Sequence, residues 1–310
     1  MPDNIGVGDK LTYGGNIAYI YQRVSPTQYY IQSATGGLAT NTAAGTACTV
    51  LRAYNSVNSA LEVGVADGSH LNTNNLVTGN IQLNLACYAD GIDTARLNTW
   101  YFTTGINSYI RVFTPYLLSE VGISQRHSGV WTTNAYRLEV SATADLASSV
   151  GSSCPYTRIE GLQISFNNTG FTGGYGIVVG SVVYIESNII KGGTAATAAY
   201  GIFSGDGSYN ARIVNNIIYG FENYGIYSKW YCTPIVYNNT VSNCGIGIGS
   251  ASGNLIAKNN IVQACTTGYS SSFYSSSDYN LSSDATAPGA NSKQTATVQF
   301  EDSANKDFRI

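Results

Sequence analysis

The sequence predicts an all-β protein: a right-handed parallel β-helix, or solenoid, preceded by a small N-terminal β unit and a short capping helix. In the C-terminal half, a short β-branched segment, an Asn-rich turn and a Gly-Ile signature recur every 20 to 28 residues, and self-similarity at such a period is typical of solenoids. No stretch shows the 3.6-residue periodicity of a helical repeat. Hydrophobic residues make up 44% of the chain and charged residues only 11%, against roughly 25% in ordinary soluble domains. Stacked strands with an uncharged polar surface account for all three observations.

Residues 1–53 are expected to form a small antiparallel β unit. Strand-like runs at 10–13, 17–21 and 29–32 alternate with turn residues such as Gly8, which is the pattern of short antiparallel strands. We expect this unit to lead directly into the cap of the β-helix.

The β-helix itself is placed at 54–310. A helix at 56–62 is expected to plug its first turn, because an open end would expose an apolar lumen and unpaired strand edges. An irregular segment is expected near 270–294, followed by a last strand at 296–300. Earlier strands are predicted at 80–87, 108–113 and 136–140.

Aligned asparagines mark the repeat, and the steps between them are 28, 23, 21 and 20 residues. In stacked coils the strands pair about 4.8 Å apart, so equivalent positions form columns along the axis. Asparagine tolerates turn conformations, and stacked side-chain amides can hydrogen-bond one another. We therefore predict a structural ladder of Asn188, Asn216, Asn239 and Asn260, echoed at Asn280, beside an inward aliphatic column of Ile164, Ile190, Ile218, Val241 and Val262.

The six cysteines form no Cys-x-x-Cys pair and have no neighbouring histidine, so no metal site is expected. Cys244 and Cys265 each lie five residues after a ladder asparagine. The register therefore makes them stacked neighbours, close enough for a disulfide in an oxidising compartment. The other cysteines are expected to be free and buried.

The clear repeats resemble the pectin-lyase-like superfamily of right-handed parallel β-helices with asparagine ladders, over roughly residues 80 to 300. Many of its members cleave or epimerise acidic polysaccharides. The compact acidic cluster of a calcium-dependent lyase, and the adjacent aspartates and Gly-His-Gly of a hydrolase, are missing here. Tyr-Gly-Ile at 175–177, 200–202 and 224–226 is similar to part of an alginate-epimerase-like motif, but the Asp-Pro-His that should follow is absent. We interpret these triplets as tight turns that enter an aliphatic column.

If the chain nevertheless carries a catalytic site, the best cluster comes from consecutive coils: Glu186, Asp206, Arg212 and Lys229. The simpler interpretation makes Glu186 and Arg212 an outward ion pair between coils, which contributes little stability, and Asp206 a turn residue. The two histidines, His70 and His127, have polar neighbours and are expected in solvated loops.

The 24 tyrosines suggest a second kind of site. Aromatic rings pack against sugars and anchor protein contacts, although scattered surface tyrosines need no function. The candidate contact residues, for a carbohydrate or another subunit, are Tyr184, Tyr219, Tyr227, Trp230, Tyr231 and Tyr237.

The net charge is −3 and the pI is near 5.3, with no cluster of Lys or Arg, so nucleic acid is not an expected partner. No apolar run reaches 18 residues, and the first residues lack the basic and apolar parts of a signal peptide. Neither membrane insertion nor a secretory route is therefore predicted. No cofactor is expected.

Two functions from different classes remain. The favoured one is a non-catalytic structural or adhesive protein of an extracellular fibre, cell surface or virus particle, self-assembling head to tail and with polysaccharide as a further partner. The alternative is a polysaccharide lyase, hydrolase or epimerase whose loop-built site carries no familiar motif. The scarcity of acid and base residues in the repeats favours the first.

Overall fold

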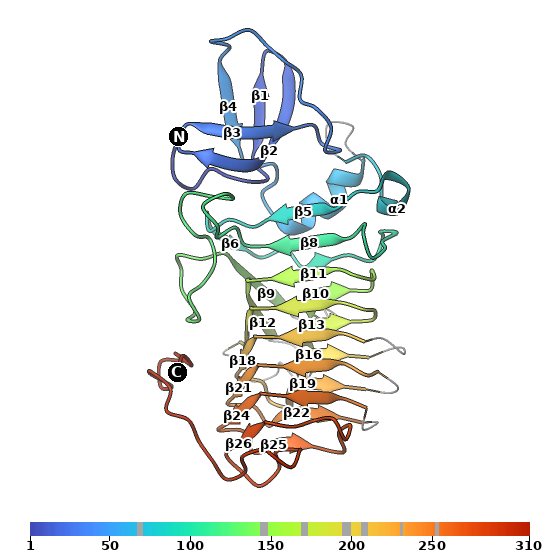
Figure 1. The fold of residues 1–310 in the computed structure, drawn as a ribbon, viewed down its shortest axis with the longest axis vertical. Coiled ribbons are helices and arrows are strands. Elements are labelled where there is room, and N and C mark those ends of the chain that lie inside the picture. The colour runs from blue at the N-terminus through green and yellow to red at the C-terminus, as the bar shows by residue number, and fades with distance from the viewer. Residues whose placement is uncertain are drawn as a thin grey trace.

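The computed structural model describes residues 1–310 except 67–70, 143–147, 169–172, 194–199, 206–209, 230–231 and 252–253. It is an elongated stack of short strands with a separate sheet at its N-terminal end (Figure 1). The prediction of an all-β parallel β-helix with a small antiparallel N-terminal unit is confirmed.

The N-terminal unit is a twisted antiparallel sheet in the order β3-β2-β1-β4. It buries Leu11, Tyr13, Ala18 and Ile20 on its inner face. The strand β4 was not predicted, because its sequence has no alternating pattern and it pairs with β1 across a long loop. The strands are β1 Lys10–Tyr13, β2 Asn16–Ser25, β3 Gln28–Gln32 and β4 Cys48–Leu51.

Two short helices, α1 Val57–Ala66 and α2 Leu76–Gly79, lie at the top of the β-helix. The helix α1 is the predicted plug. The buried Asp93 carboxylate accepts the N–H of Val57, the first residue of α1, at 2.8 Å and the hydroxyl of Tyr136 at 3.0 Å. A carboxylate at a helix N-terminus satisfies an orphan donor and complements the helix dipole. Asp93 thus fixes the plug to the first turn.

Each coil contributes one strand to each of three parallel sheets. The first sheet contains β5 Leu83–Ala86, β8 Ile110–Phe113, β11 Arg158–Glu160, β14 Tyr184–Glu186, β17 Arg212–Val214, β20 Ile235–Tyr237 and β23 Ile256–Lys258. The second contains β6 Ile92–Asp93, β9 Arg137–Ala142, β12 Gln163–Asn168, β15 Ile189–Gly192, β18 Ile217–Tyr219, β21 Thr240–Ser242, β24 Ile261–Gln263 and β26 Leu281–Ser282. The third contains β7 Leu97–Asn98, β10 Ser148–Ser152, β13 Tyr175–Val179, β16 Tyr200–Ser204, β19 Tyr224–Ser228, β22 Ile246–Ser250 and β25 Thr267–Ser270.

The turn from the first sheet to the second explains the paired asparagines of the repeat. One residue there has a positive φ, as at Asn215 (58°) and Asn238 (57°), which asparagine tolerates better than most residues. The next residue is the ladder asparagine. Asn216 Oδ1 accepts the backbone and side-chain N–H groups of Asn188, both at 3.0 Å, and the same pattern continues through Asn239 and Asn260 to Asn280.

The aliphatic column expected from strand alternation runs along the inner face of the second sheet. Ile164, Ile190, Ile218, Val241 and Val262 are in register from β12 to β24 and fully buried.

The Tyr-Gly-Ile triplets are strands, so their interpretation as tight turns is wrong. They open β13, β16 and β19, and their glycines lie where the third sheet closes on the second. A Cβ on Gly201 would lie 2.5 Å from the carbonyl oxygen of Gly225 and 2.7 Å from Ile218. Each glycine therefore makes room for the aliphatic column rather than for a turn.

The outer face of the second sheet is covered by the C-terminal tail, which runs back up the side of the stack (Figure 1). Phe300 and Phe308 meet edge to face at 5.3 Å and pack on Ile189 and Tyr219. The predicted last strand at 296–300 is wrong, because that segment is held by the side chain of Gln263 instead of a strand edge.

The last turn of the β-helix is closed by side chains within the segment predicted to be irregular. Asp284 accepts the backbone N–H of Gly268, Thr286 accepts that of Tyr269, and Ser292 accepts that of Asn280. These three donors are therefore not available to a further coil.

Candidate functional site

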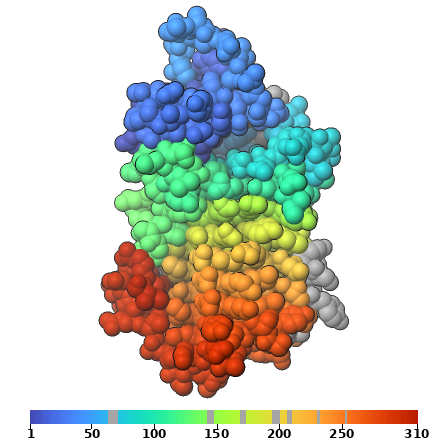
Figure 2. All heavy atoms as spheres, in the orientation of Figure 1, coloured from blue at the N-terminus to red at the C-terminus, as the bar shows by residue number. Residues whose placement is uncertain are grey.

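A cleft of about 870 Å³ lies between the N-terminal unit and the first turns of the β-helix. Figure 2 shows the recess beneath the projecting N-terminal unit. One wall is the outer face of the N-terminal sheet, with Tyr19, Tyr21 and Gln32, and the other is the outer face of the first sheet, with Tyr109, Arg111, Arg158 and Glu160. The cleft is thus lined by aromatic rings and charged groups together.

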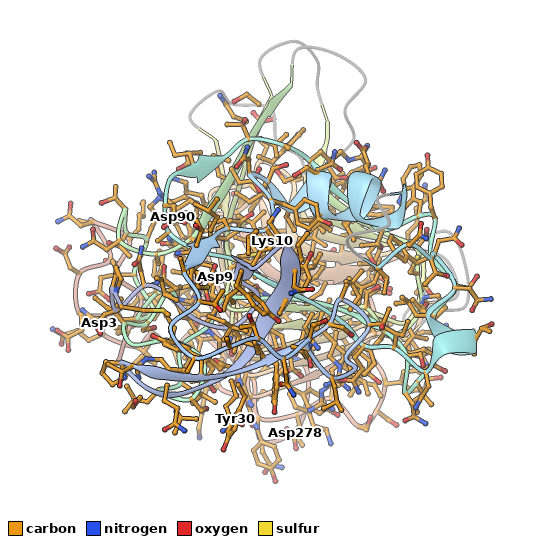
Figure 3. The ribbon with its side chains drawn as sticks, turned by 90° about the horizontal axis from the view of Figure 1, so that it is seen from above. Asp3, Asp9, Lys10, Tyr30, Asp90 and Asp278 are labelled. Carbon is orange, nitrogen blue, oxygen red and sulfur yellow. The ribbon has the colours of Figure 1, made fainter. Side chains whose placement is uncertain are left out.

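Arg52 joins the two walls. Its guanidinium lies 2.5 Å from Asp9 Oδ1, 2.5 Å from Asp90 Oδ2 and 3.5 Å from the centre of the Tyr88 ring. Burial raises the pKa of Asp9, although Arg52 opposes it. Burial also works against the charge on Arg52, but its bonds to Asp90 and Asp9 prevail and raise its pKa. Figure 3, which looks down on this end, shows Asp9 and Asp90 close together.

Every carboxylate that lines the cleft within the described residues already has partners. Glu160 is paired with Arg111 at 2.8 Å, and Glu120 accepts the N–H groups of Tyr116 and Leu117. Asp9 and Asp90 share Arg52, and Asp93 holds the plug helix. Carboxylates fixed in this way are poor general acids or bases.

Arg158 differs from the other arginines of the cleft. Its guanidinium carbon lies 4.1 Å from the ring centre of Tyr109 and 5.5 Å from that of Tyr184. Its Nε is buried and has no hydrogen-bond partner in the described part of the chain. It is therefore a cation held between two rings, with no carboxylate against it there.

A shallow pocket of about 220 Å³ continues the cleft along the first sheet. It is lined by Arg158, Glu160, Tyr184, Glu186 and Arg212. Glu186 and Arg212, predicted as an outward ion pair, are 3.4 Å apart and both partly exposed.

Lys229, a further member of the predicted catalytic cluster, does not join Glu186 and Arg212. Lys229 directly follows β19 of the third sheet, whereas Glu186 and Arg212 are on the first. Asp206 lies outside the described residues, as does His70.

The predicted tyrosine surface is divided among the three sheets. Tyr184 and Tyr237 lie on the first sheet and Tyr227 on the third. Tyr219 points outward from the second sheet, but it is buried under Phe308 at a ring distance of 5.3 Å. Trp230 and Tyr231 are outside the described residues. The four described residues of this set therefore do not form one contact surface.

His127 lies in a loop, as expected, but its ring is partly buried and hydrogen-bonded at both nitrogens. Its Nδ1 accepts the N–H of Gly129, so Nε2 carries the proton and donates to the carbonyl of Ser187 at 2.9 Å. Burial lowers its pKa to about 4. The neutral ring ties the loop before β9 to the turn of the first sheet.

Cys244 and Cys265 are free thiols in adjacent turns. A hydrogen bond between them raises the pKa of Cys244 and lowers that of Cys265. The expectation that the other cysteines are buried fails at Cys48, which is exposed on the edge strand β4.

Sequence reasoning missed most of the cleft because its residues come from the coils before the clear repeat. The available signal was Arg-Ile-Glu at 158–160, where a buried Ile159 separates two outward charges.

Sequence reasoning also missed a row of stacked tyrosines, formed by the first residue of each Tyr-Gly-Ile triplet. Tyr200 and Tyr224 stack at 5.7 Å with an interplanar angle of 5°, and Tyr175 continues the row.

Comparison with known proteins agrees with this architecture. Residues 149–302 match the family model described as a right handed beta helix region. This part of the chain is a right-handed β-helix. The match is consistent with the resemblance to the pectin-lyase-like fold. No curated protein and no solved structure shows significant similarity to the chain.

Among the described residues, no group of three or more His, Cys, Asp or Glu side chains could hold a metal ion. No helix in the described portion has the length and apolar character needed to cross a membrane.

Proposed function

We propose that this protein is a non-catalytic adhesive β-helix that binds a polysaccharide in the cleft beneath its N-terminal unit, as part of an extracellular fibre, cell surface or virus particle. The observation that carries the proposal is the state of the carboxylates. Those among the described residues that line the cleft are all held by arginine or by backbone and hydroxyl donors. Such a site is organised to recognise a ligand and has little capacity to move protons.

The walls of the cleft suit a sugar chain. Tyr21 is 47% exposed, and Arg158 presents a guanidinium between two rings. Sugars offer both hydroxyl groups for polar contacts and C–H faces for aromatic rings, and a site of this kind combines the two. Because Arg158 lacks a carboxylate partner among the described residues, we expect acidic polysaccharides to bind more tightly than neutral ones.

The test is a binding panel of soluble acidic and neutral polysaccharides, measured by calorimetry with wild-type protein and variants. Tyr21→Ala and Arg158→Gln should each weaken binding at least tenfold. Tyr274→Ala is the matched control, since Tyr274 is 45% exposed at the far end of the stack and does not line the cleft. Equal binding by all variants, or binding to none of the panel, would overturn the proposal.

One observation favours an enzyme as the second candidate. Glu160 and Glu186 are register partners on adjacent strands and both line the shallow pocket. Their side chains leave the same face of strands that lie about 4.8 Å apart, and glycosidases use a pair of neighbouring carboxylates. Size analysis of the polysaccharide after long incubation separates the two functions: shortening that Glu186→Gln abolishes would establish the enzyme.

Self-association remains a proposal, and the C-terminal end bears on its geometry. Since Asp284, Thr286 and Ser292 occupy the last donors, a head-to-tail contact would have to displace them. We therefore expect any oligomer to form through the sides of the stack or the N-terminal sheet. The test compares wild-type protein with a Ser292→Ala variant by light scattering and electron microscopy. If the C-terminal end takes no part in assembly, both proteins should form the same oligomer.

A further inference from the structure

The strand β4 is an open edge of the N-terminal sheet (Figure 1). The opposite edge, β3, is protected, because its pairing with β2 shifts register at two places and irregularities of this kind discourage a further strand. Its last residue, Gln32, also forms a bridge to Leu38. In contrast, β4 pairs with β1 in unbroken register and contains no charge and no proline. Apart from being short, β4 therefore has none of the features with which proteins block an edge strand.

The register of the sheet determines which backbone groups of β4 point outward. A two-residue turn joins β1 to β2, so Tyr13 bonds to its partner on β2 across that turn. Bonding sides alternate along an antiparallel strand, so Leu11 also bonds to β2. Cys48 and Val50, which face Tyr13 and Leu11 on the other side, therefore direct their N–H and C=O groups away from β1. No backbone partner for these groups is found in the described part of the chain.

The outward groups of β4 are complementary to themselves. We infer that β4 pairs with β4 of a second copy of this chain, antiparallel and with Thr49 on the two-fold axis. Cys48 then faces the partner's Val50, and Val50 faces the partner's Cys48. Each outward N–H meets a C=O, so all the open groups of both copies are bonded. The result is a symmetric dimer whose two four-stranded sheets become one continuous sheet.

The side chains around β4 favour a second copy as the occupant. Residues 24–51 include no charged residue, so two copies can approach without like-charge repulsion. Cys48 and Thr49 are exposed, and Leu51 is 62% exposed. In the inferred register Leu51 lies opposite the partner's Ala47, and this contact removes apolar surface from water.

The inference rests on the self-association proposed above and makes its geometry specific, but it does not depend on polysaccharide binding. No residue of β4 lines the cleft, so the pairing uses none of the walls of the cleft. A dimer carries two clefts, and attachment of both to one polysaccharide would raise the avidity.

Disulfide trapping tests the register directly. Thr49 and the partner's Thr49 form a non-hydrogen-bonded pair, in which Cα atoms lie about 4.5 Å apart, within the range of about 4.4 to 6.8 Å for disulfides. Thr49→Cys should therefore cross-link two copies. Leu51→Cys is the matched control, because it is exposed on the same face of β4 but would lie about 14 Å from its equivalent.

Both variants are made together with Cys48→Ser, so that each has one cysteine on β4. Glutathione disulfide is the oxidant, and each cross-link converts two protein thiols into one disulfide and releases two glutathione molecules. Non-reducing electrophoresis should show a covalent dimer for Thr49→Cys and little for Leu51→Cys. Equal cross-linking of the two variants would overturn the inferred register.

A second experiment removes one bond of the interface. Val50→Pro deletes an outward N–H and takes no bond from the pairing with β1, whereas Val50→Thr keeps the N–H. Analytical ultracentrifugation without polysaccharide measures the dimer. By symmetry Val50→Pro removes two hydrogen bonds, so its dissociation constant should rise at least about tenfold, and that of Val50→Thr should change little. Circular dichroism shows whether each variant is folded.

A wild-type protein that stays monomeric, or a dimer that Val50→Pro leaves unchanged, overturns the inference. Polysaccharide binding by such a monomer would leave the proposed cleft function intact. A dimer with the inferred cross-link that binds no polysaccharide would support the inference and overturn only the cleft function.

Discussion

The side-chain amide of Gln263 holds the backbone of Val298 with both of its polar atoms. Gln263 Oε1 accepts the Val298 N–H at 2.9 Å, and Nε2 donates to the Val298 carbonyl at 3.3 Å. Gln163, four coils earlier on the same sheet, holds Thr132 in the same way. A glutamine amide presents one donor and one acceptor at the spacing of a peptide group. Each glutamine therefore bonds the backbone of a segment that passes over the second sheet, as a neighbouring strand would.

The tail held by Gln263 is predicted to stabilise the whole stack. Phe308 is buried against Tyr219 and Phe300, so Phe308→Ala should lower the free energy of unfolding by about 3 kcal/mol. Urea denaturation followed by circular dichroism measures the change. Ile310→Ala, at a residue that is 75% exposed, should have little effect. Equal stability of the two variants would show that the tail does not pack on the sheet.

The asparagine ladder is predicted to depend on the second asparagine of each pair. Asn216→Ala removes an acceptor for two N–H groups of Asn188 and leaves buried donors and acceptors unpaired, at a cost of at least about 3 kcal/mol. Asn215→Gly should be nearly neutral, because Asn215 is exposed with a φ of 58° that glycine adopts freely. Thermal and urea unfolding of both variants compare them. The opposite order of stabilities would contradict the ladder.

Glycine at the closure of the third sheet on the second is predicted to be essential. Gly201→Ala would bring a methyl group within 2.5 Å of the Gly225 carbonyl oxygen, and overpacking against backbone should cost about 2 kcal/mol or more. Gly91→Ala is the control, since a Cβ there meets nothing within 4 Å. The comparison of melting temperatures decides the point, and a Gly201→Ala protein as stable as Gly91→Ala would refute this role.

His127 predicts a loss of stability in mild acid. Burial lowers its folded pKa to about 4, below the unfolded value of about 6.5. The unfolded chain therefore takes up a proton first as pH falls, and stability present above pH 6.5 is lost between pH 6.5 and 4, by about 3 kcal/mol in total. His127→Gln should flatten urea-unfolding profiles over this range. A wild-type profile that is already flat would contradict the buried neutral ring.

Cys244 and Cys265 are predicted to form a disulfide when oxidised. Adjacent strands place the Cα atoms about 4.8 Å apart, within the range of about 4.4 to 6.8 Å for disulfides. With glutathione disulfide as oxidant, two protein thiols are converted into one disulfide and two glutathione molecules are released. Peptide mapping by mass spectrometry should detect the cross-link in wild-type protein and not in Cys244→Ser. Only mixed disulfides with glutathione at Cys265 would show that the sulfur atoms cannot meet.

Much of the β-helix could be predicted from the sequence because its determinants are local and repeated. A positive-φ residue, which is asparagine in three of these turns, is followed by a buried asparagine, and alternation at Ile190 and Ile218 points the aliphatic residues inward. Stacking copies this local pattern from coil to coil. One turn therefore predicts its neighbours in the chain.

The errors arose where a segment depends on a partner far away in the sequence. Tyr219 looked like an outward contact residue, but the tail residue Phe308 covers it. His127 has polar neighbours in sequence, but its ring is partly buried and donates to the carbonyl of Ser187. Neither contact leaves any periodic trace in the sequence.

The sequence by itself determined the parallel stack, its asparagine ladder and the neighbouring pair of Cys244 and Cys265, since these follow from the repeat period alone. Only the tertiary structure decided where ligand sites can form. The cleft needs Arg52 to bring the N-terminal sheet over Arg158. It results from long-range packing, in which residues meet that no local pattern links.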